Sequence, residues 1–550
     1  MKYGLFFAAM IGLNPLWAQL ANDDSGTELL KPFKAKLAES QKFDPTPIVP
    51  KLDEQERKQE YNVPSHLKEL KYPAPVLTPL PFSTKKDKNQ VEVASFYAKI
   101  GFGYPISPLA ELSYHSQPAK NYRYGATFKH HSGQGNYNLN QRFSNTGLNL
   151  GGAYFTKNNL AVDGNLGFNL RGNRFYGYGD SLDLNDSTAV KKDSVNQRFT
   201  EIYANVGVFN SNLGKNNLNY KATLGFYRLS DLHQASEISV SPNLALEKFI
   251  GKKNLKHSFA ADLGLNYVSF SDTIATDTNN LANRLLFYFK PNFNYNGGAF
   301  RVKIGANVGS SEGKFYALPD IAVSGLLLKG KITAYAGWKG EIKQNNFRSL
   351  SLYNPFIVSA LTMRHTKQQD FYGGVKGSVQ KVNYDAKVAY SRAQNLPLFL
   401  NDSLSNYRKF SVLFDTANIF SLSFAADMEI KQNLRLSATA AYNVYSFNNV
   451  RKAYHLPVLE TNISLQYTQK KLQLKAELYA NAGVAYFDEI SRTDKRLGGL
   501  FDLNLYGSYF FHKNIAAFVS LNNILNNQNQ RWFRYPQIGF NAMGGIIAKF

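Results

Sequence analysis

Hydrophobic and polar residues alternate with a period of two along most of the chain from Val91 to Phe550. In the segment 472–482, every second position is apolar: Leu472, Leu474, Ala476, Leu478, Ala480 and Ala482. The intervening positions include Gln473, Lys475, Glu477 and Asn481. Successive side chains of a strand point to opposite faces, so this pattern predicts strands with one apolar and one polar face. Charges on the second face exclude a sandwich core there.

Two further segments show the same alternation. Near 91–104, the apolar set is Ala94, Phe96, Ala98, Ile100 and Phe102, with Ser95 and Lys99 on the other face. Farther on, Leu160, Val162, Leu166, Phe168 and Leu170 alternate with Asp163, Asn165, Asn169 and Arg171. In a membrane barrel the apolar face meets lipid and the charged face meets a watery lumen. A soluble protein of two packed sheets is the alternative interpretation.

The connections between these segments fall into two classes. Short polar turns are predicted at Gln117–Asn121, Lys157–Asn159, Asn212–Asn216, Gly251–Asn254, Gly297–Gly298, Gly330–Lys331, Lys381–Asn383, Lys431–Asn433, Gln469–Lys471 and His512–Asn514. Between them lie mostly longer connections, notably 180–196, 271–280, 346–369, 395–408, 448–458 and 525–534. Short turns at one end and long loops at the other are typical of outer-membrane barrels.

The fold class predicted from these observations is all-β, a transmembrane antiparallel β-barrel of about 22 strands over 91–550. One long strand near 409–430 leaves the count open, because it can also be divided in two. An even number of strands places both chain ends on the periplasmic side. We therefore expect an integral protein of the outer membrane of a Gram-negative bacterium.

The first 18 residues are typical of a signal peptide. Lys2 precedes an apolar run from Gly4 to Leu13, and Ala18 offers a small residue at the cleavage point. A short buried helix is the alternative. No Cys follows, and this excludes a lipoprotein anchor.

Residues 19–90 differ from the rest of the chain in composition. The prolines of this stretch are Pro32, Pro45, Pro47, Pro50, Pro64, Pro73, Pro75, Pro79 and Pro81. Proline at this density, mixed with charged residues, opposes both helix and sheet. We expect a largely disordered periplasmic arm, with room for a short helix at 67–71, that offers a contact for a periplasmic or outer-membrane partner.

Composition adds three constraints. The chain has 34 Tyr and 40 Phe but 5 Met, and its mean hydropathy is −0.34. After the N-terminal segment, no apolar run reaches the ~18 residues that a spanning helix needs. The absence of Cys excludes disulfides, thiolate metal sites and cysteine nucleophiles. The net charge of +23 is spread along the chain without a basic helix or a recognised module, so we expect no nucleic-acid partner.

The end of the chain carries a specific local pattern. Apolar residues lie at steps of two, and the chain ends on an aromatic; we predict an assembly signal formed by Ile538, Phe540, Ala542, Ile546, Ala548 and Phe550. This pattern resembles the strand by which the barrel-assembly machinery accepts its clients. An ordinary edge strand that ends in Phe by chance is the alternative.

Three segments at the end of the chain together resemble the final hairpin of TonB-dependent receptor barrels; they are Phe518–Asn527, Tyr535–Phe540 and Gly544–Phe550. Asn346–Pro355 and Gly373–Gly377 are similar to segments of short receptor-like barrels from the Bacteroidota. The resemblance covers 91–550 and implies solute uptake across the outer membrane. The chain departs from the family before Val91, where about 70 proline-rich residues are too few for a plug with its own core. No energy-coupling box is recognisable there either.

Few residues suggest chemistry. Asp180, Asp183, Asp186 and Asp193 cluster in one predicted loop, but without the spacing of a known calcium loop. His130 and His131 are adjacent, so in a strand they point to opposite faces and cannot chelate one ion. Neither a phosphate loop, a zinc motif nor a nucleophile elbow is present. We expect no enzyme, no cofactor and no metal site.

Two functions remain open. The first is passage or uptake of a solute through a plugless, receptor-like barrel. The second is a non-transporting accessory subunit of an outer-membrane assembly or secretion complex, with the arm 19–90 contacting a partner. The family resemblance favours the first, and the arm favours the second.

Overall fold

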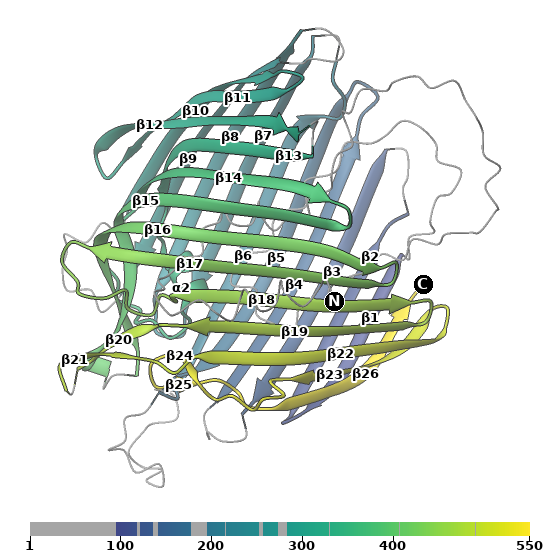
Figure 1. Ribbon diagram of the computed structural model, residues 1–550, viewed down its shortest axis with the longest axis vertical. Helices are drawn as coiled ribbons and strands as arrows, with labels where there is room; N and C mark the ends of the chain where they lie inside the picture. Colours follow the sequence, from purple (N-terminus) through teal and green to yellow (C-terminus); the bar gives the residue numbers. More distant parts are fainter. Residues whose placement is uncertain are drawn as a thin grey trace.

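The computed structural model describes residues 95–117, 121–135, 141–177, 195–214, 216–251, 257–272, 283–328, 331–405, 408–489 and 491–550. The predicted signal peptide, the arm 19–90, residues 91–94 and the four aspartates of the loop 180–193 lie outside this part of the chain. The described residues form one sheet of 22 antiparallel strands that closes into a barrel (Figure 1). This confirms the predicted fold class.

The strands follow one another around the barrel in chain order. The first eleven are β1 (Phe96–Tyr104), β2 (Ser107–His115), β3 (Tyr122–Gln134), β4 (Arg142–Phe155), β5 (Leu160–Arg174), β6 (Asn196–Asn210), β7 (Leu218–Ser230), β8 (Ser236–Ile250), β9 (His257–Ser271), β10 (Asn283–Asn296) and β11 (Phe300–Ser311). The others are β12 (Lys314–Leu327), β13 (Ile332–Lys343), β14 (Thr366–Val379), β15 (Val382–Asn401), β16 (Phe410–Lys431), β17 (Leu434–Phe447), β18 (Leu459–Gln469), β19 (Leu472–Ala482), β22 (Leu500–His512), β23 (Ile515–Asn522) and β26 (Asn541–Lys549). The segment near 409–430 is thus one continuous strand.

The ten short connections lie where the alternation pattern predicted them, at one end of the barrel that we call the turn end (Figure 1). Four of them have two residues, and these are the turns 380–381, 432–433, 470–471 and 513–514. Asn159 ends the β4–β5 turn with a φ of 66°. Asn tolerates this left-handed conformation better than most residues.

The longer connections lie at the opposite end, which we call the loop end, together with the two-residue turns 105–106 and 312–313. The predicted long loops all fall there, together with the connection 483–499, which the sequence reading did not single out. The latter carries the hairpin β20 (Ala485–Asp488) and β21 (Thr493–Arg496). The loop 523–540 carries a second small hairpin, β24 (Gln530–Trp532) and β25 (Tyr535–Pro536).

The two faces of the barrel wall differ as predicted. Exposed large apolar side chains cover the outer face, among them Ile100, Leu166, Leu224, Leu285, Ile304, Phe371 and Leu474. On β19, Leu474 is 44% exposed, whereas Lys475 and Glu477 on the lumen face form an ion pair of 3.1 Å. Among the described residues, none of the helices has the length and hydropathy needed to span a bilayer.

The last strand begins later than the alternation of apolar residues suggested. β26 begins at Asn541, so Ile538 and Phe540 belong to the preceding loop. Asn522 Nδ2 donates to Asn541 Oδ1 at 2.8 Å, at the point where pairing of β23 with β26 begins. The alternation of apolar residues therefore extends into the loop before the strand. Ile546 is 57% exposed on the outer face, as the pattern required.

Candidate functional site in the barrel lumen

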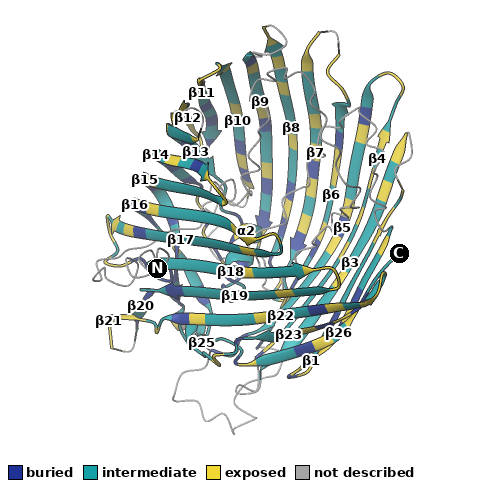
Figure 2. Ribbon diagram, turned by 45° about the vertical axis from the view of Figure 1, so that its right-hand side comes forward, coloured by how far each residue is buried: buried dark blue, intermediate teal, exposed yellow. Residues whose placement is uncertain are grey.

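The connection between β13 and β14 contains the helix α2 (Phe347–Tyr353), which lies inside the outline of the barrel (Figure 2). The sequence defines both of its ends. Asn346 caps the start, since its side chain accepts from Ser349 N at 2.7 Å, and Ser349 Oγ accepts from Asn346 N at 3.0 Å. Such a reciprocal box satisfies two N–H groups that the first turn leaves unpaired. Pro355 follows the C-cap residue Asn354 and opposes any continuation of the helix.

Glu237 of β8 fixes the start of α2 to the barrel wall. Its carboxylate accepts from Phe347 N at 2.7 Å and from Arg348 N at 3.1 Å. Tyr227 of β7 donates to the same carboxylate at 2.8 Å and accepts from Asn346 Nδ2 at 2.9 Å. Glu237 is fully buried, so the three donors Phe347 N, Arg348 N and Tyr227 Oη replace the water that its charge would otherwise require.

Two arginine contacts extend this attachment to β5 and β6. Arg348 of α2 forms an ion pair of 2.5 Å with Glu201 of β6, whose side chain is 3% exposed. Arg171 of β5 donates to the Ser351 carbonyl at 3.4 Å. A loop that starts from β13 thus reaches strands five to eight positions away around the barrel. It does so by crossing the lumen.

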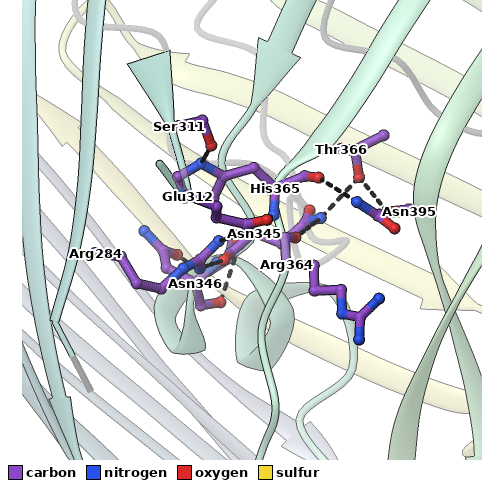
Figure 3. A network of polar contacts seen from close by, with 10 residues as sticks. Arg284, Ser311, Glu312, Asn345, Asn346, Arg364, His365, Thr366 and Asn395 are labelled. Atoms are coloured by element: carbon purple, nitrogen blue, oxygen red, sulfur yellow. Dashed lines mark hydrogen bonds and ion pairs between the residues drawn. The ribbon is translucent and has the colours of Figure 1, made fainter. Parts of the chain in front are cut away.

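A polar network holds the two ends of the same loop (Figure 3). Glu312, in the turn between β11 and β12, accepts from Arg284 at 3.2 Å and from His365 N at 2.9 Å. Asn345 Nδ2 donates to Thr366 Oγ1 at 2.7 Å, and Thr366 Oγ1 donates to the Asn395 carbonyl at 2.6 Å. The Arg364 side chain points away from this group in Figure 3.

His365 is neutral in this network. Burial, and then the positive charge of Arg284, lower its pKa to about 3. Its Nδ1 forms a hydrogen bond with Ser311 Oγ. The neutral ring therefore adds no second positive charge beside Arg284.

Aromatic side chains from several loops meet beside α2. We call this set the closure cluster; it comprises Phe175, Phe199, Leu229, Ala235, Phe270, Phe347, Leu350, Phe356, Ile357, Leu361, Met363, Phe399, Phe410, Trp532 and Tyr535. Tyr535 stacks on Phe356 with ring centroids 3.8 Å apart, and Trp532 meets Tyr353 edge to face at 5.6 Å. Each such pair adds about 0.5–1.5 kcal/mol beyond burial of apolar area. The loops 344–365 and 523–540 are thus packed against each other inside the loop end.

Paired charges line the lumen wall between the closure cluster and the turn end. Lys303 and Asp320 lie 2.5 Å apart, and Arg435 and Asp427 lie 2.7 Å apart. Pairs of this kind keep charged side chains satisfied on a wall that faces water. The lumen thus combines a polar wall with an apolar, aromatic closure at one end.

The residues that suggested chemistry in the sequence are not part of this site. His130 and His131 lie on opposite faces of β3, bonded to Thr146 Oγ1 at 2.8 Å and to Ser107 Oγ at 3.2 Å. Within the described ranges, no three His, Asp or Glu side chains group as a metal site would require. The anchors Glu201 and Glu237 were missed. The only local signal for them is an acidic residue on the lumen face near the loop end of a strand.

Comparisons with known proteins identify the fold. No protein-family model matches the chain, and no curated protein matches its sequence. Solved structures similar to it include the siderophore receptor PiuA from Acinetobacter baumannii, with a TM-score of 0.60, 11% identity, and coverage of 84% of this chain and 82% of that one. The pyoverdine receptor FpvA from Pseudomonas aeruginosa has a TM-score of 0.61 and 11% identity, and the match covers 83% of this chain and 79% of that one. The FrpB iron transporter from Neisseria meningitidis has a TM-score of 0.63 and 9% identity, and the match covers 83% of this chain and 81% of that one. The described part of the chain thus has the barrel fold of these outer-membrane receptor and transporter structures.

Proposed function

We propose that the protein admits a solute across the outer membrane through a lumen gated by its own loops. The observation that supports this most directly is the attachment of α2 to Glu237 and Glu201 across the lumen. A loop held inside a wide barrel by a few polar anchors restricts passage until the anchors release. The similar structures named above are a siderophore receptor, a pyoverdine receptor and an iron transporter, and they favour uptake over a purely structural role.

We further propose the domain order and the orientation that the sequence implies. Residues 1–18 act as a signal peptide, 19–90 form a periplasmic arm that contacts a partner, and 91–550 form the barrel. The turn end then faces the periplasm and the loop end faces the outside, because short turns are the periplasmic connections of such barrels. The chain represents a short receptor of the Bacteroidota type without a plug domain of its own.

The assembly signal is also a proposal. Ile538, Phe540, Ala542, Ile546, Ala548 and Phe550 would be read by the barrel-assembly machinery during insertion. Support comes from the place of Phe550, which is 59% exposed on the outer face at the seam between the first and last strands. An aromatic side chain at that place suits the membrane interface.

Conductance in planar lipid bilayers tests the gated lumen. Glu237→Ala removes the two carboxylate oxygens that accept from Phe347 N and Arg348 N, so we expect a larger or more often open conductance than in the wild type. Asp320→Asn is the matched control, because it also removes one carboxylate from the lumen wall, where Asp320 pairs with Lys303 of the neighbouring strand. Equal conductance of wild type and Glu237→Ala, with both barrels folded, would show that α2 does not gate the lumen.

A further inference from the structure

The short turns at the turn end of the barrel carry charge of one sign. In the sequence, none of these turns contains Asp or Glu, and most of them contain Lys. The lysines that the structure describes in the turns are all exposed, as is one more lysine at the end of β16. We call this set the lysine rim; it comprises Lys157, Lys331, Lys381, Lys431, Lys470, Lys471 and Lys513.

The charge of the lysine rim is not neutralised by the chain itself where the structure describes it. None of the rim lysines forms an ion pair with a described acidic side chain. On β16, the acids that precede Lys431 are Glu429 and Asp427. Glu429 lies opposite Arg435 in the ladder, and Asp427 pairs with Arg435 at 2.7 Å. The rim is therefore open to an anion from outside the chain.

The loop end shows that this one-sided charge is not simply a result of the basic composition. In the connection 483–499, basic side chains are mixed with Asp488, Glu489 and Asp494. Lys495 there pairs with Asp488 at 2.6 Å. Acids thus accompany the bases at one end of the barrel and are missing from the turns at the other. The asymmetry needs an explanation that is specific to the turn end.

Exposed aromatic side chains mark the membrane interface next to the lysine rim. Tyr122 and Tyr154 lie opposite each other on the outer face of β3 and β4, and both are exposed. Tyr509 is exposed on the outer face of β22. Aromatic residues gather at the level of the lipid headgroups in membrane barrels. Lys157 follows Tyr154 by at most about 10 Å of chain, and its flexible stem lets the ammonium group reach the same level.

The distribution of the rim around the barrel favours a membrane surface over a docked protein. The rim lysines lie between β4 and β5 and at every second strand junction from β12–β13 to β18–β19, with one more between β22 and β23. A bilayer surrounds the barrel on all sides, whereas a docked protein would contact one sector of the rim. The ligand that combines negative charge with this geometry is a lipid phosphate group.

We propose that the lysine rim binds the phosphate groups of anionic phospholipids around the turn end of the barrel. Attraction of this kind grows with each Lys near the charged surface and is screened by salt. The inference goes beyond solute uptake and depends on it in no step. Only the assignment to one leaflet uses the orientation proposed above, which places these lipids on the periplasmic side.

Spin-labelled lipids test the rim on the full chain in vesicles of phosphatidylcholine. The electron paramagnetic resonance spectrum separates lipids held at the protein surface from free ones. It therefore gives the affinity for labelled phosphatidylglycerol relative to labelled phosphatidylcholine. Both leaflets contain the probe, so the measurement assumes no orientation. We expect the wild type to prefer phosphatidylglycerol roughly threefold at low salt, and to lose this preference at ~0.5 M NaCl.

Two sets of variants remove the same charge from opposite ends of the barrel. The rim variant combines Lys381→Gln, Lys431→Gln, Lys470→Gln and Lys471→Gln. The control removes four exposed charges from the loop end with Arg451→Gln, Lys452→Gln, Arg492→Gln and Arg496→Gln. We expect the rim variant to lose most of the preference and the control to keep it. Arginine at the four rim positions keeps the charge and should keep the preference as well.

Equal affinity of the wild type for the two lipids would overturn the proposal and leave an acidic protein as the partner of the rim. A preference that persists in the folded rim variant, or in the wild type at ~0.5 M NaCl, would also overturn it. The salt result needs no variant, so it decides the matter if the rim variant does not fold. None of these outcomes affects the gated lumen, which the conductance of Glu237→Ala tests separately.

The leaflet has its own test, because the chain has no Cys. Lys471→Cys introduces a single thiol into the rim. A maleimide that cannot cross the outer membrane should leave this thiol unlabelled in intact cells and label it after lysis. Labelling in intact cells would contradict the periplasmic leaflet, whereas the lipid preference in vesicles would still show that the rim binds phosphate groups.

Discussion

Phe96 and Phe550 exchange two backbone hydrogen bonds, with N···O distances of 2.8 and 2.9 Å, at the seam where β1 meets β26. The pairing continues with Tyr97 opposite Lys549 and Ala98 opposite Ala548. The final residue of the chain thus completes the ladder that closes the barrel. Without it, the first strand would begin with unpaired backbone groups at an open edge.

The first prediction concerns this seam. Phe550→Ser should lower the amount of folded barrel in the outer membrane without affecting export through the inner membrane, since the aromatic anchor is lost. Lys549→Ser, on the lumen face of the same strand end, should have a smaller effect. Gel mobility of unheated samples separates folded from unfolded protein. Wild-type levels of folded Phe550→Ser would mean that the terminal aromatic has no part in assembly.

The second prediction concerns the lipid face of β19. Leu478→Arg should destabilise the barrel by roughly 2–4 kcal/mol, the cost of Arg near the bilayer midplane, and Glu477→Arg should cost much less. Unfolding in urea from lipid vesicles measures both values. Similar losses in the two variants would show that the faces are assigned wrongly, because a slip of one residue exchanges them.

The third prediction concerns the buried ion pair of α2. Glu201→Gln leaves the Arg348 charge without its partner and should destabilise the attachment by about 3–5 kcal/mol. Adding Arg348→Met should restore part of this loss, because the unpaired charge is then removed. The rate at which a protease cleaves the loop 344–365 in folded barrels measures how firmly α2 is attached. If the double variant is cleaved as fast as Glu201→Gln, the ion pair does not account for the stability.

The fourth prediction is a dependence on pH that arises from His455 in the β17–β18 loop. Its Nδ1 bonds to the Phe399 carbonyl at 2.7 Å, and its Nε2 accepts from Phe533 N at 3.2 Å. Both bonds suit the neutral ring. Burial lowers the pKa of His455 to about 4, although the hydrogen bond to the Phe399 carbonyl acts in the opposite direction and raises it.

The folded pKa of His455 lies below its unfolded value of about 6.5, so the released loop binds more protons than the packed one. The closure cluster should therefore be most stable above pH 6.5 and lose about 2 kcal/mol as the pH falls to 5. Open probability in bilayers should rise over this range in the wild type. His455→Gln should remove most of the rise; an unchanged pH response in this variant would exclude His455 as its source.

The strands and turns were predictable because their information is local. A period of two is visible within ten residues, and turns such as 380–381 interrupt it with polar side chains. The start of β26 was placed too early, since Ile538 and Phe540 continue the alternation outside the strand. The alternation shows only which residues are apolar, whereas the extent of a strand depends on the hydrogen bonds that its backbone makes with the neighbouring strands.

The lumen site could not be predicted in the same way. Phe347 and Glu237 are 110 residues apart in the chain, and Gln141 and Pro536, which also share a hydrogen bond, are 395 apart. Contacts at such separations depend on how the barrel closes, and no local spacing encodes them. The sequence predicted a long loop at 346–369, of which the last four residues belong to β14, and gave no sign that the loop turns inward.

The double hold on the start of α2 has a kinetic consequence. Asn346 and Glu237 together accept from the first N–H groups of α2, and Glu201 forms an ion pair with the neighbouring Arg348. If α2 moved only part of the way out, a charge or several N–H donors would be left unpaired in an apolar surrounding. Intermediate positions are thus higher in energy than either end point. The conductance of the lumen should therefore switch between discrete levels, with dwell times set by one barrier. It should not vary continuously, as it would if the loop were unattached and flexible.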